Sequence, residues 1–190
     1  MPHTATVRVP ATSANLGPGF DSIGLALAIA QEVTVSLRPL EPHPGGLSRL
    51  VLDAARSAYR LARVETPAEL YATGRPSIPV GRGLGASAAA RAAGIVAADA
   101  LMGGVLTAEQ KLTLGANLEG HADNMAPALF GGLRVVVRDG DRFLHVAAAL
   151  APGLKVVLYV PDFDMPTNES RKLLPQQLSR EDAIHNIGRA

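Results

Sequence analysis

The chain has 190 residues, and 18 lysines and arginines against 17 acidic residues give it a formal net charge of +1 at pH 7. So balanced a charge argues against a dedicated nucleic-acid-binding protein and against one that binds acidic membranes. The chain contains no cysteine, which excludes disulfides, zinc–thiolate sites, iron–sulfur clusters and a thiol nucleophile. Hydrophobic residues make up 47% but aromatic residues only 4%, which predicts an aliphatic core. The N-terminus lacks the basic and apolar regions of a signal peptide, so a cytoplasmic protein is expected.

The first half of the chain alternates strand-like and helix-like patterns. Polar and apolar residues alternate over residues 4–9 and 32–38, as in half-buried strands. Three prolines and two glycines in residues 38–46 predict a surface loop. Apolar residues at helical spacing predict a helix over residues 50–64, and a strand is expected near residues 70–72.

Two further helices are expected in the middle of the chain. A stretch rich in glycine and proline, residues 74–85, leads into an alanine-rich helix over about residues 87–102. Thr107 and Gln110 have the spacing of a capping box, which predicts a helix that ends near Glu119.

The last third of the chain returns to strand-like patterns. Runs of β-branched residues predict strands over residues 133–138 and 154–160, with a hairpin turn at Asp139–Gly140. A short helix is expected from Thr167, and a second one, capped by Ser179, begins about two turns before the end of the sequence.

The segment PVGRGLGASAAA, residues 79–90, places three glycines directly before a helix. Glycine lets backbone amides approach a polyphosphate closely, and the amides and dipole of the following helix complement its charge. The loop matches neither the Walker A pattern nor the dinucleotide-binding Gly-x-Gly-x-x-Gly pattern. Ser87 offers a hydroxyl ligand for Mg²⁺, and the plainer alternative is a glycine-rich turn with Ser87 as the helix N-cap.

Four blocks of sequence stand out in order along the chain: VRVPATSANLGPGFDSIGLAL (7–27), PVGRGLGASAAA (79–90), LEGHADNMAPALFGG (118–132) and PTNESRKLLP (166–175). Together they resemble the homoserine kinase family, a member of the GHMP kinase superfamily, which also contains galactokinase and mevalonate kinase. The resemblance covers essentially the whole chain. It implies an α+β fold with an N-terminal domain of the ribosomal protein S5 domain 2-like type over residues 1–150. Residues 151–190 would be the start of an incomplete C-terminal GHMP kinase domain.

The resemblance implies ATP-dependent phosphorylation of L-homoserine to O-phospho-L-homoserine, on the route to threonine, with ATP and Mg²⁺ as cofactors. A homodimer is a further expectation. Two alternatives stay open: a kinase of the same superfamily for another small hydroxyl substrate such as mevalonate, and a truncated, inactive remnant that still binds nucleotide. The superfamily's third glycine motif has no counterpart here, so we expect the 190-residue chain to be nearly inactive and dimeric or prone to aggregation.

The resemblance also assigns residues to the site. Those that bind ATP are Pro79, Gly81, Gly83, Leu84, Gly85, Ala86 and Ser87. Ala86 replaces the first of two serines in the family's loop, whereas the second, Ser87, is retained and pairs with Glu119 as a ligand of Mg²⁺. Arg49 stands where family members often have an asparagine in the helix beside the adenine.

Five residues are implied around the amino-acid substrate: Asn15, Asp21, His121, Asn124 and Arg171. Asp21 suits the ammonium group, Arg171 the carboxylate, and Asn124 with His121 the hydroxyl. Asp123 and Asn124 are the candidate catalytic residues. Asp123 is assigned to orientation, with the role of general base as the second choice, because a loose phosphoryl-transfer transition state needs little activation of the nucleophile.

Each of these residues also has a plainer interpretation. Asn15 and Asp21 fit a polar loop, Arg171 an exposed helix, and Glu119 a solvated carboxylate at a helix end. The acidic and amide residues around His121 invite a zinc interpretation, but a spacing with one histidine suits no common zinc pattern. The other histidines, His3, His43, His145 and His185, match no block and are expected on the surface.

Overall fold

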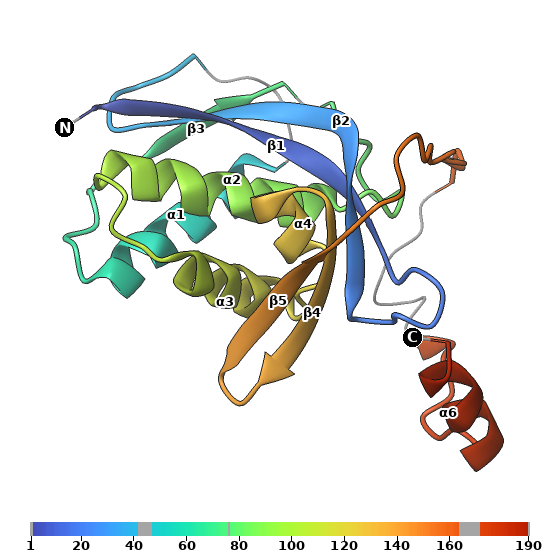
Figure 1. Ribbon diagram of the computed structural model, residues 1–190. Helices are drawn as coiled ribbons and strands as arrows, with labels where there is room; N and C mark the ends of the chain where they lie inside the picture. Colours follow the sequence, from blue (N-terminus) through green and yellow to red (C-terminus); the bar gives the residue numbers. More distant parts are fainter. Residues whose placement is uncertain (1, 42–46, 76, 164–171, 190) are drawn as a thin grey trace.

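The computed structural model describes residues 2–41, 47–75, 77–163 and 172–189. One antiparallel sheet is covered on one face by helices (Figure 1). The strands are β1 (Thr4–Ala14), β2 (Ile23–Ser36), β3 (Tyr71–Gly74), β4 (Leu133–Asp139) and β5 (Arg142–Ala148). The helices are α1 (Ser48–Ala62), α2 (Ala86–Leu101), α3 (Ala108–Glu119), α4 (Met125–Phe130) and α6 (Arg180–Ile187). The predicted α+β class is confirmed.

The long strand β2 organises the sheet. It pairs with β1 along most of its length, with a shift in register between Pro10 and Thr12. Its other edge pairs with β4 over residues 23–25 and with β3 over residues 33–36. The predicted hairpin joins β4 to β5, and Gly140 adopts a φ of +61° in its turn. The end of β1 and the start of β2 thus lie at the same end of the sheet, where the candidate site is found.

Helix α2 occupies the centre of the core because its residues are small. Of its 16 residues, 12 are buried, and most of these are alanines. A Cβ atom at Gly94 would lie 2.2 Å from the carbonyl oxygen of Val51, so glycine allows α1 to pack closely against α2. Tyr59 is the one aromatic residue among the buried hydrophobic residues of the described chain, which confirms the expected aliphatic core.

The predicted capping box fixes the position of α3. The hydroxyl of Thr107 accepts a hydrogen bond from the Gln110 amide at 3.1 Å, and the Gln110 side chain accepts one from the Thr107 amide at 2.8 Å. The helix ends at Glu119, and Gly120 follows in the left-handed region with a φ of +92°. The sequence therefore predicts both ends of this helix correctly, and with them the position of Glu119.

Two expectations are wrong. Residues 154–160 are all described and form no strand: Val157 and Tyr159 are 93% and 89% exposed, and no neighbouring strand pairs with them. His145 is not a free surface residue, because its ring stacks on Phe130 at a centroid distance of 4.3 Å. Its Nδ1 atom is buried without a hydrogen-bond partner among the described residues.

The predictions for the two C-terminal helices can be compared with the structure only in part. Ser179 caps α6 as predicted, since its hydroxyl accepts a hydrogen bond from the Asp182 amide at 3.0 Å. None of the eight residues of α6, all of them described, is buried. The helix expected from Thr167 begins outside the described residues. Within the described part of the chain, every helix is too short or too polar to cross a membrane.

Candidate active site

A cavity of about 330 Å³ lies between the glycine loop and the turn that follows α3. All seven residues predicted to bind ATP line it. Asn15, Glu119, His121 and Asn124 line the same cavity, so residues from three of the four sequence blocks meet in one space. Asp21 and Asp123 are not among its lining residues, and Arg171 lies outside the described residues.

The glycines of the loop are required by its backbone. Gly81, Gly83 and Gly85 have φ values of +72°, +71° and +64°, a region that other residues enter at a cost. At Gly85 a second constraint applies, because a Cβ atom would lie 1.9 Å from the hydroxyl oxygen of Thr12. A Cβ atom at Gly83 would meet no described atom within 4 Å. The loop therefore packs against β1 at Gly85 and is open at Gly83.

The start of α2 is suited to hold an anion. Its N-cap is Gly85, which rules out Ser87 as the cap, and no side-chain hydrogen bond caps this end of the helix. No acidic residue lies in that turn. Free amides and the positive end of the helix dipole thus face the cavity. Since neither lysine nor arginine is among its described lining residues, a polyphosphate there would rely on these amides and on a bound cation.

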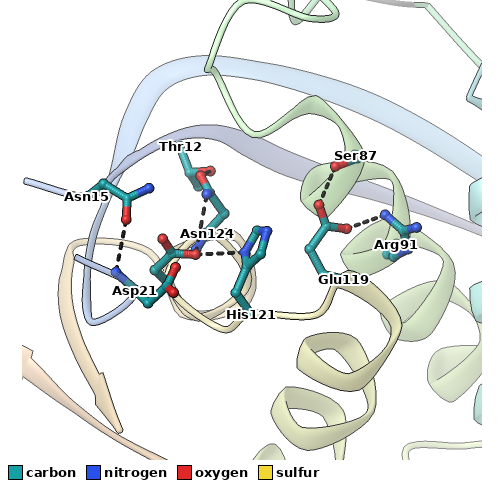
Figure 2. Close-up of polar contacts among 9 residues, drawn as sticks. Thr12, Asn15, Asp21, Ser87, Arg91, Glu119, His121 and Asn124 are labelled. Carbon is teal, nitrogen blue, oxygen red and sulfur yellow. Dashed lines mark hydrogen bonds and ion pairs between the residues drawn. The ribbon is translucent and has the colours of Figure 1, made fainter. Parts of the chain in front are cut away.

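Glu119 reaches α2 from the end of α3 and makes two contacts there (Figure 2). Its Oε1 accepts a hydrogen bond from the Ser87 hydroxyl, and its Oε2 forms an ion pair with Arg91. The Glu119 side chain is only 9% exposed, so it is not the solvated carboxylate of the plainer interpretation. Arg91 is not among the predicted site residues, although it follows Ser87 by four positions and therefore shares its helix face.

The donor atoms at this point fit Mg²⁺. A hydroxyl and a carboxylate oxygen beside a phosphate-binding loop are the ligands that Mg²⁺ takes in combination with substrate phosphates and water. Among the described residues, no cluster of three histidine or acidic side chains could hold a metal.

His121 and Asn124 are positioned by Asp123, which is fully buried. Oδ1 of Asp123 lies 2.9 Å from Nδ1 of His121 and accepts a hydrogen bond from the Asn124 amide at 2.8 Å. A carboxylate oxygen can only accept, so Nδ1 of His121 is the donor in this contact. A Cβ atom at Gly24 would lie 1.8 Å from the carbonyl oxygen of Asp123, so this turn packs directly on β2. Asp123 therefore lies behind the cavity wall and supports it.

Thr12 is a site residue that the sequence does not single out. Its side chain is fully buried, and its hydroxyl donates a hydrogen bond to Oδ1 of Asn124 at 2.7 Å. This contact fixes which way the Asn124 amide points. The Thr12 amide also donates to the carbonyl of Leu84 at 3.1 Å, so one residue of β1 holds both the loop and the turn.

Asn15 and Asp21 are joined by a loop that has its own backbone constraint. Their φ values are +59° and +56°, and Oδ1 of Asn15 accepts a hydrogen bond from the Asp21 amide at 2.9 Å. Asparagine and aspartate tolerate this left-handed conformation better than most residues. In the view of Figure 2 the pair lies beside His121 and Asn124, on the side away from Ser87 and Glu119.

Comparison with known proteins identifies the family. The model of the GHMP kinases N terminal domain matches residues 49–132. A homoserine kinase of Cutibacterium acnes is 40% identical over 202 residues, an alignment that covers 98% of this chain and 68% of the relative. The chain belongs to the homoserine kinase family. A homoserine kinase of Moorella thermoacetica is also 40% identical, over 96% of this chain.

A solved homoserine kinase structure from Cytophaga hutchinsonii superposes with a TM-score of 0.76, at 27% identity over 99% of this chain. The chain spans 65% of that protein and 65% of the Moorella thermoacetica relative. These relatives within the homoserine kinase family are therefore longer than the 190-residue chain.

Proposed function

We propose that the chain is the nucleotide-binding part of a kinase that transfers the γ-phosphoryl group of MgATP to the hydroxyl of L-homoserine. The observation that carries the proposal is that one cavity is lined both by the start of α2, which has no side-chain cap, and by Glu119, His121 and Asn124. The relatives of this family that match nearly the whole chain are named homoserine kinases. The products would be ADP and O-phospho-L-homoserine.

The phosphates would lie on the amides of the glycine loop and of the first turn of α2. Ser87 and Glu119 would hold Mg²⁺, which neutralises charge on the transferred phosphoryl group when bound. The adenine would lie beside Leu47 and Val80, which line both the cavity and a small apolar hollow next to it. Arg49 does not line either space: its side chain is 91% exposed and pairs with Asp53.

On the acceptor side, His121 and Asn124 would orient the homoserine hydroxyl toward the phosphates. Asp123 would act through them, because it does not line the cavity. This arrangement supports the orienting role of Asp123 over that of a general base in direct contact with substrate. Asp21 and Arg171 remain the proposed partners of the ammonium and carboxylate groups.

The decisive experiment is a coupled assay of ADP release with homoserine, mevalonate and galactose as acceptors. It is run on the 190-residue chain alone and on a fusion with the C-terminal portion of the Moorella thermoacetica relative. The fusion is expected to show homoserine-dependent turnover at about 1–100 s⁻¹, as is usual for kinases, whereas the 190-residue chain alone is expected to be nearly inactive. Turnover of mevalonate or galactose without turnover of homoserine would overturn the substrate assignment.

A further inference from the structure

The contact among Ser87, Glu119 and Arg91 balances charge inside the cavity wall. Both oxygens of the Glu119 carboxylate have a partner, the Ser87 hydroxyl on one and the Arg91 guanidinium on the other. The side chains of Glu119 and Arg91 are 9% and 21% exposed, so water screens this pair weakly. The carboxylate that would bind a metal ion thus already has a resident counter-ion.

This counter-ion weakens the attraction of Glu119 for a free metal ion. A divalent cation that approached Oε1 of Glu119 would meet a neutral pair rather than a negative group, with the Arg91 guanidinium on the other oxygen of the same carboxylate. Asp123 does not line the cavity, and its Oδ1 is bonded to His121 and Asn124. Like charges repel strongly where water is largely excluded.

A bound nucleotide would make the same position attractive to a divalent cation. The start of α2 and the glycine loop would place a polyphosphate beside Ser87, and the described cavity lining contains no lysine or arginine to neutralise it. A divalent cation would then gain phosphate oxygens in addition to Ser87 and Glu119. Arg91 can keep its contact with Oε2 while Oε1 turns to the metal.

We propose that Arg91 is a positioning residue that makes metal binding at Ser87 and Glu119 depend on the nucleotide. In the absence of nucleotide it occupies Glu119 and keeps the affinity for a free divalent cation low. When the phosphates are present it holds the carboxylate in place for the incoming cation. The inference rests on the proposed nucleotide site, but its main consequence is a change in metal affinity that can be measured without nucleotide.

The test measures Mn²⁺ binding without nucleotide, by electron paramagnetic resonance of the free ion. Arg91→Met removes the charge at similar length and is expected to bind Mn²⁺ about tenfold or more tightly than the unmodified chain, a usual size for coupling between sites. Arg91→Lys restores the charge and should return the affinity to the original low value. Adding Glu119→Gln to Arg91→Met should abolish the gain.

Lys111→Met is the matched control. Lys111 pairs with Asp99 at 2.8 Å between the same two helices, with side chains 23% and 7% exposed. The control loses a comparable ion pair away from the cavity and should gain no Mn²⁺ affinity. Thermal denaturation compares the stability of the two variants, and Arg91→Gln replaces Arg91→Met if the latter does not fold.

Equal Mn²⁺ affinity in the unmodified chain and in Arg91→Met or Arg91→Gln would overturn the inference, as would an equal gain in Lys111→Met. A fluorescent ATP analogue, added with Mg²⁺ to the same samples, tests the nucleotide site separately. If the analogue does not bind, the proposed function fails, and the comparison of metal affinities still decides the role of Arg91.

Discussion

The hydroxyl of Thr12 donates a hydrogen bond to Oδ1 of Asn124 across 112 positions of sequence, and the two side chains lie 2.7 Å apart. The contact joins β1 to the turn before α4 and fixes the orientation of an amide that lines the cavity. Gly85 passes so close to the same hydroxyl that no side chain fits there. The glycine loop, the first strand and the turn that carries Asn124 are therefore held by one buried group.

Replacing Thr12 with valine should destabilise the fold and loosen Asn124. The exchange keeps the shape of the side chain but leaves Oδ1 of Asn124 without its donor, at a cost of about 1–3 kcal/mol. Urea denaturation would measure the loss in the free energy of unfolding. Thr12→Ser keeps the hydroxyl and is the control. Equal stability of the valine and serine variants would show that the hydrogen bond is not needed.

Alanine at Gly85 should be much more harmful than alanine at Gly83. Both positions are left-handed, which costs an alanine about 1–2 kcal/mol. Only at Gly85 would the new Cβ atom also collide with a buried group, the Thr12 hydroxyl, and overpacking adds about 1–3 kcal/mol. Thermal denaturation of the two variants tests the difference, and calorimetry should show MgATP binding weakened about tenfold or more in Gly85→Ala. Similar melting temperatures and similar MgATP affinities for the two variants would contradict the packing found at Gly85.

Ser87→Ala should weaken the binding of MgATP about tenfold, the loss of one interaction with a charged group. The same variant should bind ATP in the presence of a chelator as well as the unmodified chain does, because the amides of the first turn of α2 are unchanged. Calorimetry under the two conditions separates what the metal and what the phosphates contribute to the affinity for ATP. A loss of ATP affinity that is equal with and without Mg²⁺ would show that Ser87 is not a ligand of the metal.

The features that the sequence predicts correctly are those with local causes. The capping box of α3 and the hairpin after β4 depend on residues within a few positions of each other. The glycine loop is similar, because its backbone conformation and the helix after it are both set within residues 79–90. Such local signals are enough to locate Glu119 and the glycine loop, and the family resemblance adds Asn15, His121 and Asn124, which line the same cavity.

The features that are missed or wrong depend on distant partners. Arg91 meets Glu119 across 28 positions and Thr12 meets Asn124 across 112, so neither contact has a local signature. The β-branched run at residues 154–160 has the composition of a strand, but a strand forms only where another strand pairs with it. The surface position expected for His145 is wrong because nothing in its own neighbourhood shows that Phe130, fifteen positions earlier, covers its ring.

His145 should make the stability of the protein depend on pH. Burial, and secondarily the nearby positive charge of Arg134, lower the pKa of this histidine below its ordinary value of 6.5. The folded chain therefore takes up the proton less readily than the unfolded chain does. The stability associated with the neutral ring is complete above about pH 6.5 and is lost as the pH falls from there through the pKa of the folded state.

The measurement is the free energy of unfolding in urea between about pH 5 and pH 7.5, a window above the ordinary pKa values of carboxylates. His145→Phe keeps a ring that can stack on Phe130 but cannot take up a proton, and the unpartnered Nδ1 is removed without the loss of a hydrogen bond within the described chain. Its stability should fall less toward acid pH than that of the unmodified chain. His185→Gln, at an exposed position of α6, should leave the pH dependence unchanged. Parallel curves for the unmodified chain and His145→Phe would show that this half-buried histidine does not control the acid response.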